Sequence, residues 1–185
     1  MGKIFAFYGP SASGKSEIQK QLIHSGYPKI ITATTRPPRE HEQTGVHYIF
    51  MDALLFKASI EANKFIEWTE YNGYYYGTLK SSIDEVLNAA GIAHIVMDLA
   101  GVLALKQLYS NTIAIYVGAN IETIGRRLEA RGSAAEEILK RVKNAEELEL
   151  SSEYRQYADV ILWNHDGIDF QDTMRRIHEL IEAER

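Results

Sequence analysis

Cysteine is absent from this sequence, which excludes disulfide bonds and zinc sites built on thiolate ligands. A surplus of positive charge is also missing, because the net charge is −5 at neutral pH. This balance argues against a protein that binds nucleic acid or an anionic membrane, since such proteins usually carry an excess of Lys and Arg. An anionic ligand would have to be held by local clusters of cations.

Long apolar runs and low-complexity linkers are missing as well. The longest apolar stretch, residues 89–105, contains His94 and Asp98, so a buried strand followed by a helix fits it better than a membrane span. The apolar run before Gly9 is too short for a signal peptide, and we expect a cytoplasmic protein. The histidines show no metal-site spacing. A length of 185 residues suits one ordinary domain.

Strand and helix patterns alternate from one end of the chain to the other. We expect strands at residues 4–8, 30–32, 95–98, 112–117 and 159–163. We expect helices at residues 15–26, 82–91, 121–131, 134–150 and 169–184, with capping boxes at Ser82 and Ser133 starting two of them. Buried strands that alternate with helices predict an α/β fold with a parallel sheet covered on both faces.

The segment between residues 32 and 78 has a different pattern. Extended residues flank Asn72-Gly73, a strong signal for a tight turn, so residues 65–78 are predicted to form an antiparallel hairpin. Residues 48–50 are extended, and Asp52 can cap a helix that runs to about residue 62. We therefore expect a small β-rich insertion that stands off the parallel sheet.

One segment fits the phosphate-binding pattern G-x-x-x-x-G-K-[ST], and its residues are Gly9, Pro10, Ser11, Ala12, Ser13, Gly14, Lys15 and Ser16. It lies between a predicted strand and a predicted helix, where backbone N–H groups and the helix N-terminus can surround phosphates. Lys15 would reach the β- and γ-phosphates of a nucleoside triphosphate, and Ser16 would bind Mg²⁺. The pattern predicts a P-loop kinase fold.

The acceptor has to be inferred from other parts of the chain. Arg36 and Arg39 lie three residues apart in a proline-stiffened loop, and two guanidinium groups can bind a phosphate through paired donors. Tyr48 and Tyr76 carry hydroxyl groups that can also donate to phosphate. Each feature alone also fits an exposed loop or a half-buried hairpin. Together they favour a phosphate-bearing acceptor.

Taken together, these segments resemble the guanylate kinase family over nearly the whole chain. The matching motifs are Gly9-Pro10-Ser11, Thr34-Thr35-Arg36-x-Pro38-Arg39, Glu42 with Gly45 and Tyr48, Phe65-Ile66-Glu67-Trp68, Tyr75-Tyr76-Gly77-Thr78, Arg127-Leu128-x-x-Arg131-Gly132, Glu136-Glu137 and Arg141. The resemblance implies a mobile lid at about residues 121–150, with Arg131 and Arg141 as its cations.

The resemblance also implies which side chains bind the acceptor. Those assigned to its phosphate are Arg36, Arg39, Tyr48 and Tyr76. Those assigned to its base are Thr32, Glu67 and Thr78. A carboxylate can accept both adjacent N–H donors of guanine at once, and adenine lacks that pair of donors. Glu67 is therefore a discriminating residue for guanine.

The sequence departs from the family in three places. Ala12-Ser13 and Glu17 alter the usual P-loop, and Val96 replaces the first of two acidic residues, which leaves Asp98 as the one carboxylate there. Asp98 can serve Mg²⁺, the acceptor, or the cap of the following helix, and alignment on Gly101 favours the acceptor. Thr32 and Thr78 replace frequent serines and keep the hydroxyl group.

We therefore expect one domain, residues 1–185, with a core at about 1–31, 79–120 and 151–185, an acceptor-binding insertion at about 32–78 and the lid. The expected reaction is ATP + GMP ⇌ ADP + GDP with Mg²⁺, and the expected catalytic residues are Lys15, Arg131 and Arg141. The alternatives are a P-loop kinase for another phosphorylated acceptor, such as a sugar bisphosphate, and a non-catalytic interaction module. The sequence does not distinguish a monomer from a dimer.

Overall fold

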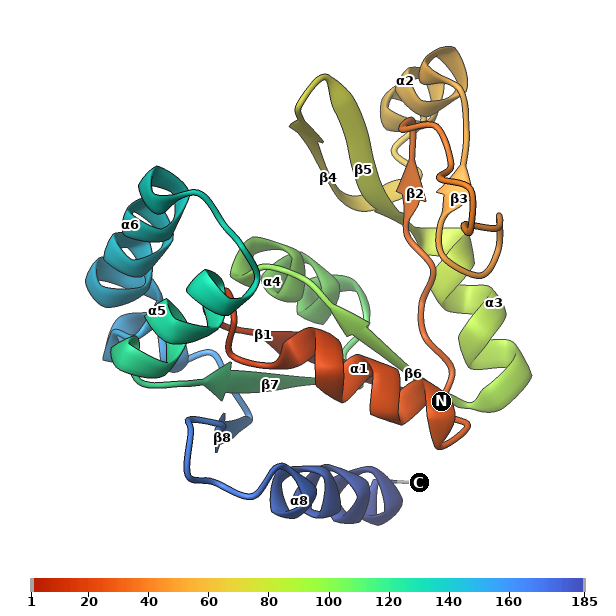
Figure 1. Ribbon diagram of the computed structural model, residues 1–185. Coiled ribbons are helices and arrows are strands. Elements are labelled where there is room, and N and C mark those ends of the chain that lie inside the picture. Colours follow the sequence, from red (N-terminus) through yellow and green to blue (C-terminus); the bar gives the residue numbers. More distant parts are fainter. Residues whose placement is uncertain (1, 185) are drawn as a thin grey trace.

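The computed structural model describes residues 2–184 and contains two separate β-sheets (Figure 1). The larger one, the core sheet, has the strand order β6-β1-β7-β8, and all its neighbouring strands are parallel. Its strands are β1 (Lys3–Tyr8), β6 (Ile92–Val96), β7 (Thr112–Gly118) and β8 (Val160–Trp163). The predicted α/β fold with a parallel sheet is confirmed.

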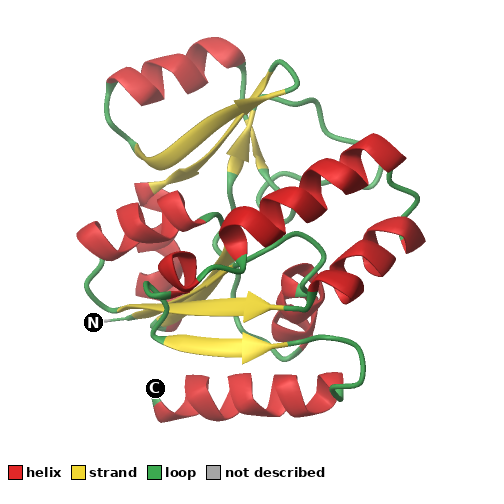
Figure 2. Cartoon of the chain, turned by 90° about the vertical axis from the view of Figure 1, so that its left-hand side faces the viewer, coloured by secondary structure: helices red, strands yellow, loops and turns green. Residues whose placement is uncertain are grey.

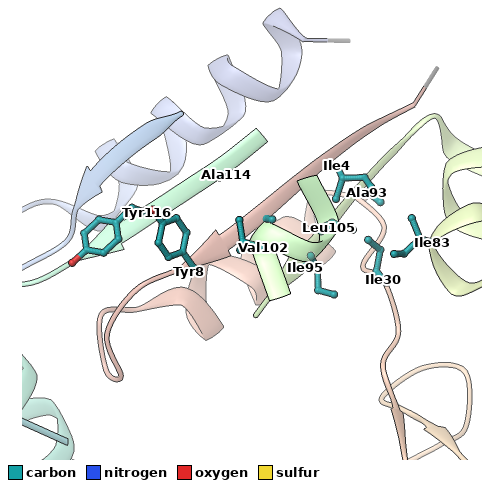
Figure 3. Close-up of a cluster of buried hydrophobic side chains, with 11 residues drawn as sticks. Ile4, Tyr8, Ile30, Ile83, Ala93, Ile95, Val102, Leu105, Ala114 and Tyr116 are labelled. Carbon is teal, nitrogen blue, oxygen red and sulfur yellow. The ribbon is translucent and has the colours of Figure 1, made fainter. Parts of the chain in front are cut away.

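Helices cover both faces of the core sheet because successive side chains of its central strand point to opposite sides. Ile4 and Tyr8 pack in one buried cluster with Val102 of α4, as Figure 3 shows. Phe5 and Phe7 pack on the other face, against α1 and α8. The helices on these faces are α1 (Lys15–His24), α3 (Lys80–Ala90), α4 (Leu99–Leu108) and α8 (Phe170–Ala183).

The second sheet, here called the small sheet, has the order β3-β2-β5-β4 and lies above the core sheet in Figure 1 and at the top of Figure 2. Its elements are β2 (Ala33–Thr34), β3 (Ile49–Phe50), α2 (Ala53–Glu61), β4 (Phe65–Tyr71) and β5 (Tyr74–Leu79). Asn72 and Gly73 have φ angles of 51° and 77°, the left-handed backbone of the predicted tight turn. Asp52 caps α2 by accepting from the Leu55 N–H, as predicted.

A helical arm lies beside the core sheet, at the left of Figure 1. It consists of α5 (Ile121–Ala130), α6 (Ala135–Asn144), the π-helical turn η1 (Ala145–Glu149) and the short helix α7 (Ser152–Arg155). Ile124, Leu128 and Ala145 pack with Ala12 of the P-loop in a third buried cluster. The arm is therefore anchored where it leaves and rejoins the core. No helix among residues 2–184 has the length and apolarity that crossing a membrane requires.

Two strand predictions differ from the structure. The strand expected at residues 30–32 is wrong: Ile30 is fully buried beside β6 and donates its N–H to His94, but the strand itself forms at Ala33–Thr34, in the small sheet. The strand expected at residues 95–98 ends at Val96, because Asp98 already caps α4. An apolar sequence predicts that a segment is buried, but it does not show with which strand the segment pairs.

Both predicted capping boxes are also wrong. Ser82 lies inside α3, which begins directly after β5 at Lys80 without a side-chain cap. Ser133 instead closes the end of α5: its N–H donates to Leu128 at 3.3 Å and the N–H of Gly132 donates to Glu129 at 2.9 Å. This is the Schellman arrangement of a helix C-terminus, and it leaves α6 to begin two residues later.

Candidate active site

The P-loop connects β1 to α1 and depends on two glycines for its shape. A Cβ on Gly9 would lie 2.3 Å from the Val117 carbonyl oxygen, and one on Gly14 would lie 2.2 Å from Asn164 Nδ2. Both have positive φ angles, 132° and 103°. Ala12 also has a positive φ, 62°, so the predicted departure from the usual motif places a strained alanine where glycine is favoured.

Lys15 is held against the loop that it follows. Its Nζ donates to the carbonyl oxygens of Gly9 at 2.7 Å and Pro10 at 2.6 Å. Burial lowers the pKa of the Lys15 ammonium to about 8, with Glu149 raising that pKa and Arg131 lowering it. The side chain therefore carries its charge at neutral pH and points into the part of the loop that would surround phosphates.

A polar cavity of about 240 Å³ brings the P-loop together with both predicted lid arginines. The residues around it are Ser11, Ala12, Gly14, Lys15, Ser16, Arg131 and Arg141. Arg141 pairs with Glu137 at 2.6 Å, one turn earlier on α6, as its spacing predicts. Glu17, the other departure, lies outside this cavity and interacts with Lys20 and Gln21 along α1.

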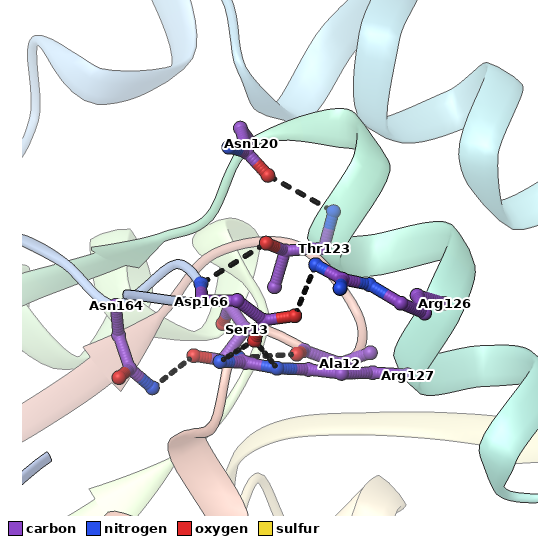
Figure 4. Close-up of polar contacts among 8 residues, drawn as sticks. All are labelled: Ala12, Ser13, Asn120, Thr123, Arg126, Arg127, Asn164 and Asp166. Atoms are coloured by element: carbon purple, nitrogen blue, oxygen red, sulfur yellow. Dashed lines mark hydrogen bonds and ion pairs between the residues drawn. The ribbon is translucent and has the colours of Figure 1, made fainter. Parts of the chain in front are cut away.

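The back of the P-loop is supported by Arg127, which the sequence marked only as part of a family motif, and by Asn164, which it did not single out (Figure 4). Asn164, which follows β8 and is almost fully buried, donates to the Ser13 carbonyl at 2.8 Å. Arg127 donates to the Ala12 carbonyl at 3.2 Å and to Asp166 at 2.9 Å. Asn164 could have been recognised in the sequence as a polar residue directly after a predicted parallel strand, because that edge of the sheet faces the ligand in such folds.

A second cluster lies in the small sheet and its adjoining loop. Arg36 pairs with Glu42 at 2.8 Å and lies 5.5 Å from the ring centre of Tyr48, which in turn contacts Tyr76. Hydrogen bonds from Arg36 and from the Arg39 backbone lower the pKa of Glu42 to about 2. The structure therefore brings together three of the four residues predicted to bind the acceptor phosphate.

Glu67 and Thr78 face each other across the β4–β5 hairpin. Thr78 Oγ1 donates to Glu67 Oε1 at 2.6 Å. Burial raises the pKa of Glu67, and the nearby negative charge of Asp98 adds to this effect against the Thr78 hydrogen bond. Asp98 itself accepts from the Gly101 N–H at 2.8 Å, so it caps α4 and also lies on the Glu67 side of the site.

Two predicted site residues are less closely connected to these clusters. The Arg39 side chain is exposed, and its backbone N–H is the group that meets Glu42. Thr32 contributes its carbonyl oxygen, which accepts from the Ile49 N–H at 2.8 Å. Within residues 2–184, no three His, Cys, Asp or Glu side chains come together as a metal-binding group.

The chain is similar in sequence to proteins of one known family. The sequence pattern of the family described as Guanylate kinase matches residues 1–184. A guanylate kinase from Thermotoga maritima is 31% identical over 189 residues, covering all of this chain and 88% of that protein. One from Rickettsia felis is 34% identical, also over the whole chain and over 95% of that protein.

The fold agrees with a solved structure as well. The crystal structure of guanylate kinase from Anaplasma phagocytophilum superposes with a TM-score of 0.69 at 20% identity, covering 99% of this chain and 86% of that one. At this identity the likeness establishes the fold. With the family pattern and the full-length relatives, it shows that this chain belongs to the guanylate kinase family.

Proposed function

We propose that this protein transfers the terminal phosphoryl group of ATP to GMP, giving ADP and GDP. The observation that carries the proposal is the cavity in which Lys15 of the P-loop meets Arg131 and Arg141 of the helical arm. Phosphoryl transfer needs little covalent chemistry from the protein, and its main requirements are alignment and cations around the transferred group.

The donor side follows from the P-loop. Its backbone N–H groups and the N-terminus of α1 would bind the phosphates of ATP. Lys15 would exchange its contacts with Gly9 and Pro10 for contacts with the β- and γ-phosphates. Arg131 and Arg141 would stabilise negative charge on the transferring group, and Arg141 would leave Glu137 to do so.

The donor set at the P-loop fits Mg²⁺. The Ser16 side chain lies at the cavity that would hold the phosphates. Mg²⁺ commonly takes few ligands from a protein and completes its shell with water and phosphate oxygens, so one hydroxyl ligand is sufficient. When bound, the ion would neutralise phosphate charge during transfer.

On the acceptor side, one group of residues would bind the phosphate of GMP and another would bind its base. Arg36, Arg39, Tyr48 and Tyr76 would bind the phosphate of GMP, with Arg36 released from Glu42 or shared with it. The base would be recognised by Glu67, Thr78, Thr32 and Asp98, because a carboxylate can accept both guanine donors. These roles make residues 32–78 the acceptor-binding part and residues 121–150 the lid.

The alternative functions predict different features. A kinase for a sugar bisphosphate needs no carboxylate for a base, whereas Glu67 is half-buried and hydrogen-bonded to Thr78. An interaction module needs no phosphate-binding cations, whereas Lys15, Arg131 and Arg141 lie around one cavity. Both observations favour the transfer of a phosphoryl group to GMP.

The test is a coupled assay of ADP release with MgATP and each of GMP, dGMP, AMP, UMP and CMP. We expect turnover with GMP at least about a hundredfold above that with AMP, because a site built on hydrogen bonds rejects a base that lacks them. Equal turnover with all five acceptors would exclude the proposed base recognition. No turnover with any would exclude the catalytic proposal.

A further inference from the structure

Lys29 lies where the chain leaves the core sheet for the small sheet (Figure 1). The backbone on both sides of it is bound to β6: the Pro28 carbonyl accepts from the His94 N–H at 3.0 Å, and the Ile30 N–H donates to the His94 carbonyl at 2.9 Å. Strand β2 of the small sheet begins only at Ala33. The backbone of Lys29 therefore belongs to the core, whereas the chain that follows it belongs to the small sheet.

The Lys29 side chain reaches Tyr48, which lies in the loop that joins β2 to β3. Its Nζ is 5.9 Å from the centre of the Tyr48 ring, and Arg36 is 5.5 Å from the same ring centre. A cation within about 6 Å of an aromatic ring centre is attracted by the negative face of the ring. Tyr48 is thus held by one cation from the core and by one that follows β2 of the small sheet.

Lys29 and Arg36 differ in their other contacts. Arg36 pairs with Glu42 at 2.8 Å, whereas Lys29 forms no ion pair within the described residues, 2–184. Lys29 is half-buried and lines a cavity of about 540 Å³ together with Glu42 and Tyr48. Burial lowers the pKa of the Lys29 ammonium group. Removal of a cation from water also strengthens its attraction to an aromatic ring, so the Tyr48 ring is a substantial partner for this group.

We propose that Lys29 is a positioning residue for the acceptor: it holds the Tyr48 ring from the core side, so that the Tyr48 hydroxyl group is in place to donate to the phosphate of GMP. The inference rests on the proposed function, because it takes Tyr48 as a ligand of that phosphate. A side chain that is already held before the ligand arrives loses less freedom on binding. Removal of the Lys29 charge should therefore weaken the binding of GMP and leave that of ATP unchanged.

The test compares Lys29→Met with the parent, because Met keeps an unbranched side chain of similar length and removes the charge. We expect the dissociation constant for GMP, measured by calorimetry, to increase about 3- to 10-fold, which is within the range that a cation–π contact provides. The dissociation constant for ATP and kcat at saturating GMP should be unchanged. Lys29→Arg retains the cation and should bind GMP like the parent.

The variant Tyr48→Phe separates positioning from a direct attraction between Lys29 and the phosphate. Phe keeps the ring that Lys29 contacts and removes the hydroxyl group, so Lys29→Met should weaken GMP binding by less than about twofold in this background. If Lys29→Met had its full effect in the Tyr48→Phe background, Lys29 would attract the phosphate directly and the inference would be overturned. Binding of GMP as tight as in the parent, by Lys29→Met or by Tyr48→Phe alone, would overturn it as well.

Lys57→Met is the matched control. Lys57 Nζ lies 5.6 Å from the centre of the Tyr75 ring, also in the small sheet, but neither residue is proposed to bind GMP. This substitution should leave GMP binding unchanged. Equal weakening by Lys57→Met and Lys29→Met would overturn the inference, because it would show a general effect on the small sheet. If the parent neither bound nor phosphorylated GMP, the proposed function itself would fail.

Discussion

At the scale of single residues, the charged side chains of the site already have partners. Lys15 is held by carbonyl groups of the P-loop, Arg36 by Glu42, and Glu67 by Thr78. In the proposed reaction, a bound phosphate or base would therefore exchange one contact for another. Single substitutions measure these exchanges because each removes one side chain and leaves the backbone of the site in place.

Replacing Lys15 by Ala should remove most of the transfer activity. We expect kcat to fall by about 10²- to 10³-fold, the typical effect of losing one preorganised group that stabilises charge in the transition state. The coupled assay measures the rate, and thermal unfolding checks that the fold is retained. Lys20→Ala, a change of an exposed lysine on the same helix, is the control. A Lys15→Ala rate within a few-fold of the parent would contradict the role of Lys15.

The raised pKa of Glu67 predicts how GMP binding depends on pH. The ionised carboxylate is the form that accepts from guanine, so affinity is full above the raised pKa and is lost as the pH falls through it. Below that pKa, the dissociation constant should increase about tenfold per pH unit. Calorimetric titrations from pH 8 to pH 4 measure this. The Glu67→Gln variant should bind GMP weakly, and its affinity should depend on pH only through titration of the GMP phosphate. An identical pH profile in parent and variant would exclude Glu67 as the hydrogen-bond acceptor for guanine.

Asp98 combines a capping role with a place beside Glu67, and two substitutions separate these effects. Asn caps helices as well as Asp does, so Asp98→Asn should keep the stability of α4 while it raises KM for GMP. Asp98→Ala should also lower the free energy of unfolding by about 1 kcal/mol. The Mg²⁺ dependence of the rate should change little in either variant. A large shift in that dependence with an unaltered KM for GMP would assign Asp98 to the metal.

At the scale of elements, the P-loop is shaped by the parts of the chain that pack behind it. Arg127 from α5 and Asn164 after β8 bind two successive carbonyl groups of the loop, at Ala12 and Ser13. These contacts fix the loop although Ala12 has an unfavourable positive φ. The phosphate-binding backbone is therefore held in place from both α5 and the end of β8.

Arg126 and Arg127 offer a matched pair for this arrangement, because both bind Asp166 and only Arg127 is hydrogen-bonded to the P-loop. We expect Arg127→Ala to weaken ATP binding about tenfold, since the loss of a charged hydrogen bond is typically worth 1.5–3 kcal/mol. Arg126→Ala, with a more exposed side chain, should change it less than about twofold. Equal effects of the two substitutions in calorimetry would show that the ion pairs with Asp166, rather than the hydrogen bond to the P-loop, determine the affinity for ATP.

At the scale of the whole molecule, the residues proposed to bind the donor and those proposed to bind the acceptor phosphate belong to different parts of the fold. The donor cavity lies between the P-loop and the helical arm, whereas the Arg36 cluster belongs to the small sheet and its loop. Direct transfer requires both groups of residues to reach one phosphoryl group and to exclude water. For the proposed reaction, we expect the small sheet and the arm to approach each other when both nucleotides are bound.

Small-angle scattering tests this approach. We expect the radius of gyration to decrease when the protein is saturated with a bisubstrate analogue that joins adenosine and guanosine through phosphates. ATP alone or GMP alone should give a smaller decrease, because each occupies only one side. An identical radius with and without the analogue would exclude closure as a step of the reaction.

Several features that depend only on neighbouring residues could be predicted from the sequence. The P-loop pattern, the Asn72-Gly73 turn and the Asp52 cap each involve backbone angles or hydrogen bonds within a few residues, and each prediction of local structure is confirmed. The family was also readable, because its motifs follow one another along the whole chain. Continuously apolar strands that alternate with helices were enough to predict a sheet covered on both faces, and β1 is buried on both.

Contacts between residues that are distant in the sequence could not be predicted, because they depend on how the elements pack. Ile30 is buried beside β6, yet the chain begins to pair as a strand only when it reaches the small sheet. Arg127 and Asn164 lie 115 and 151 residues along the chain from the P-loop residues whose carbonyl groups they bind. A residue's own neighbours largely set its backbone angles, but the partner of its side chain depends on how the elements pack.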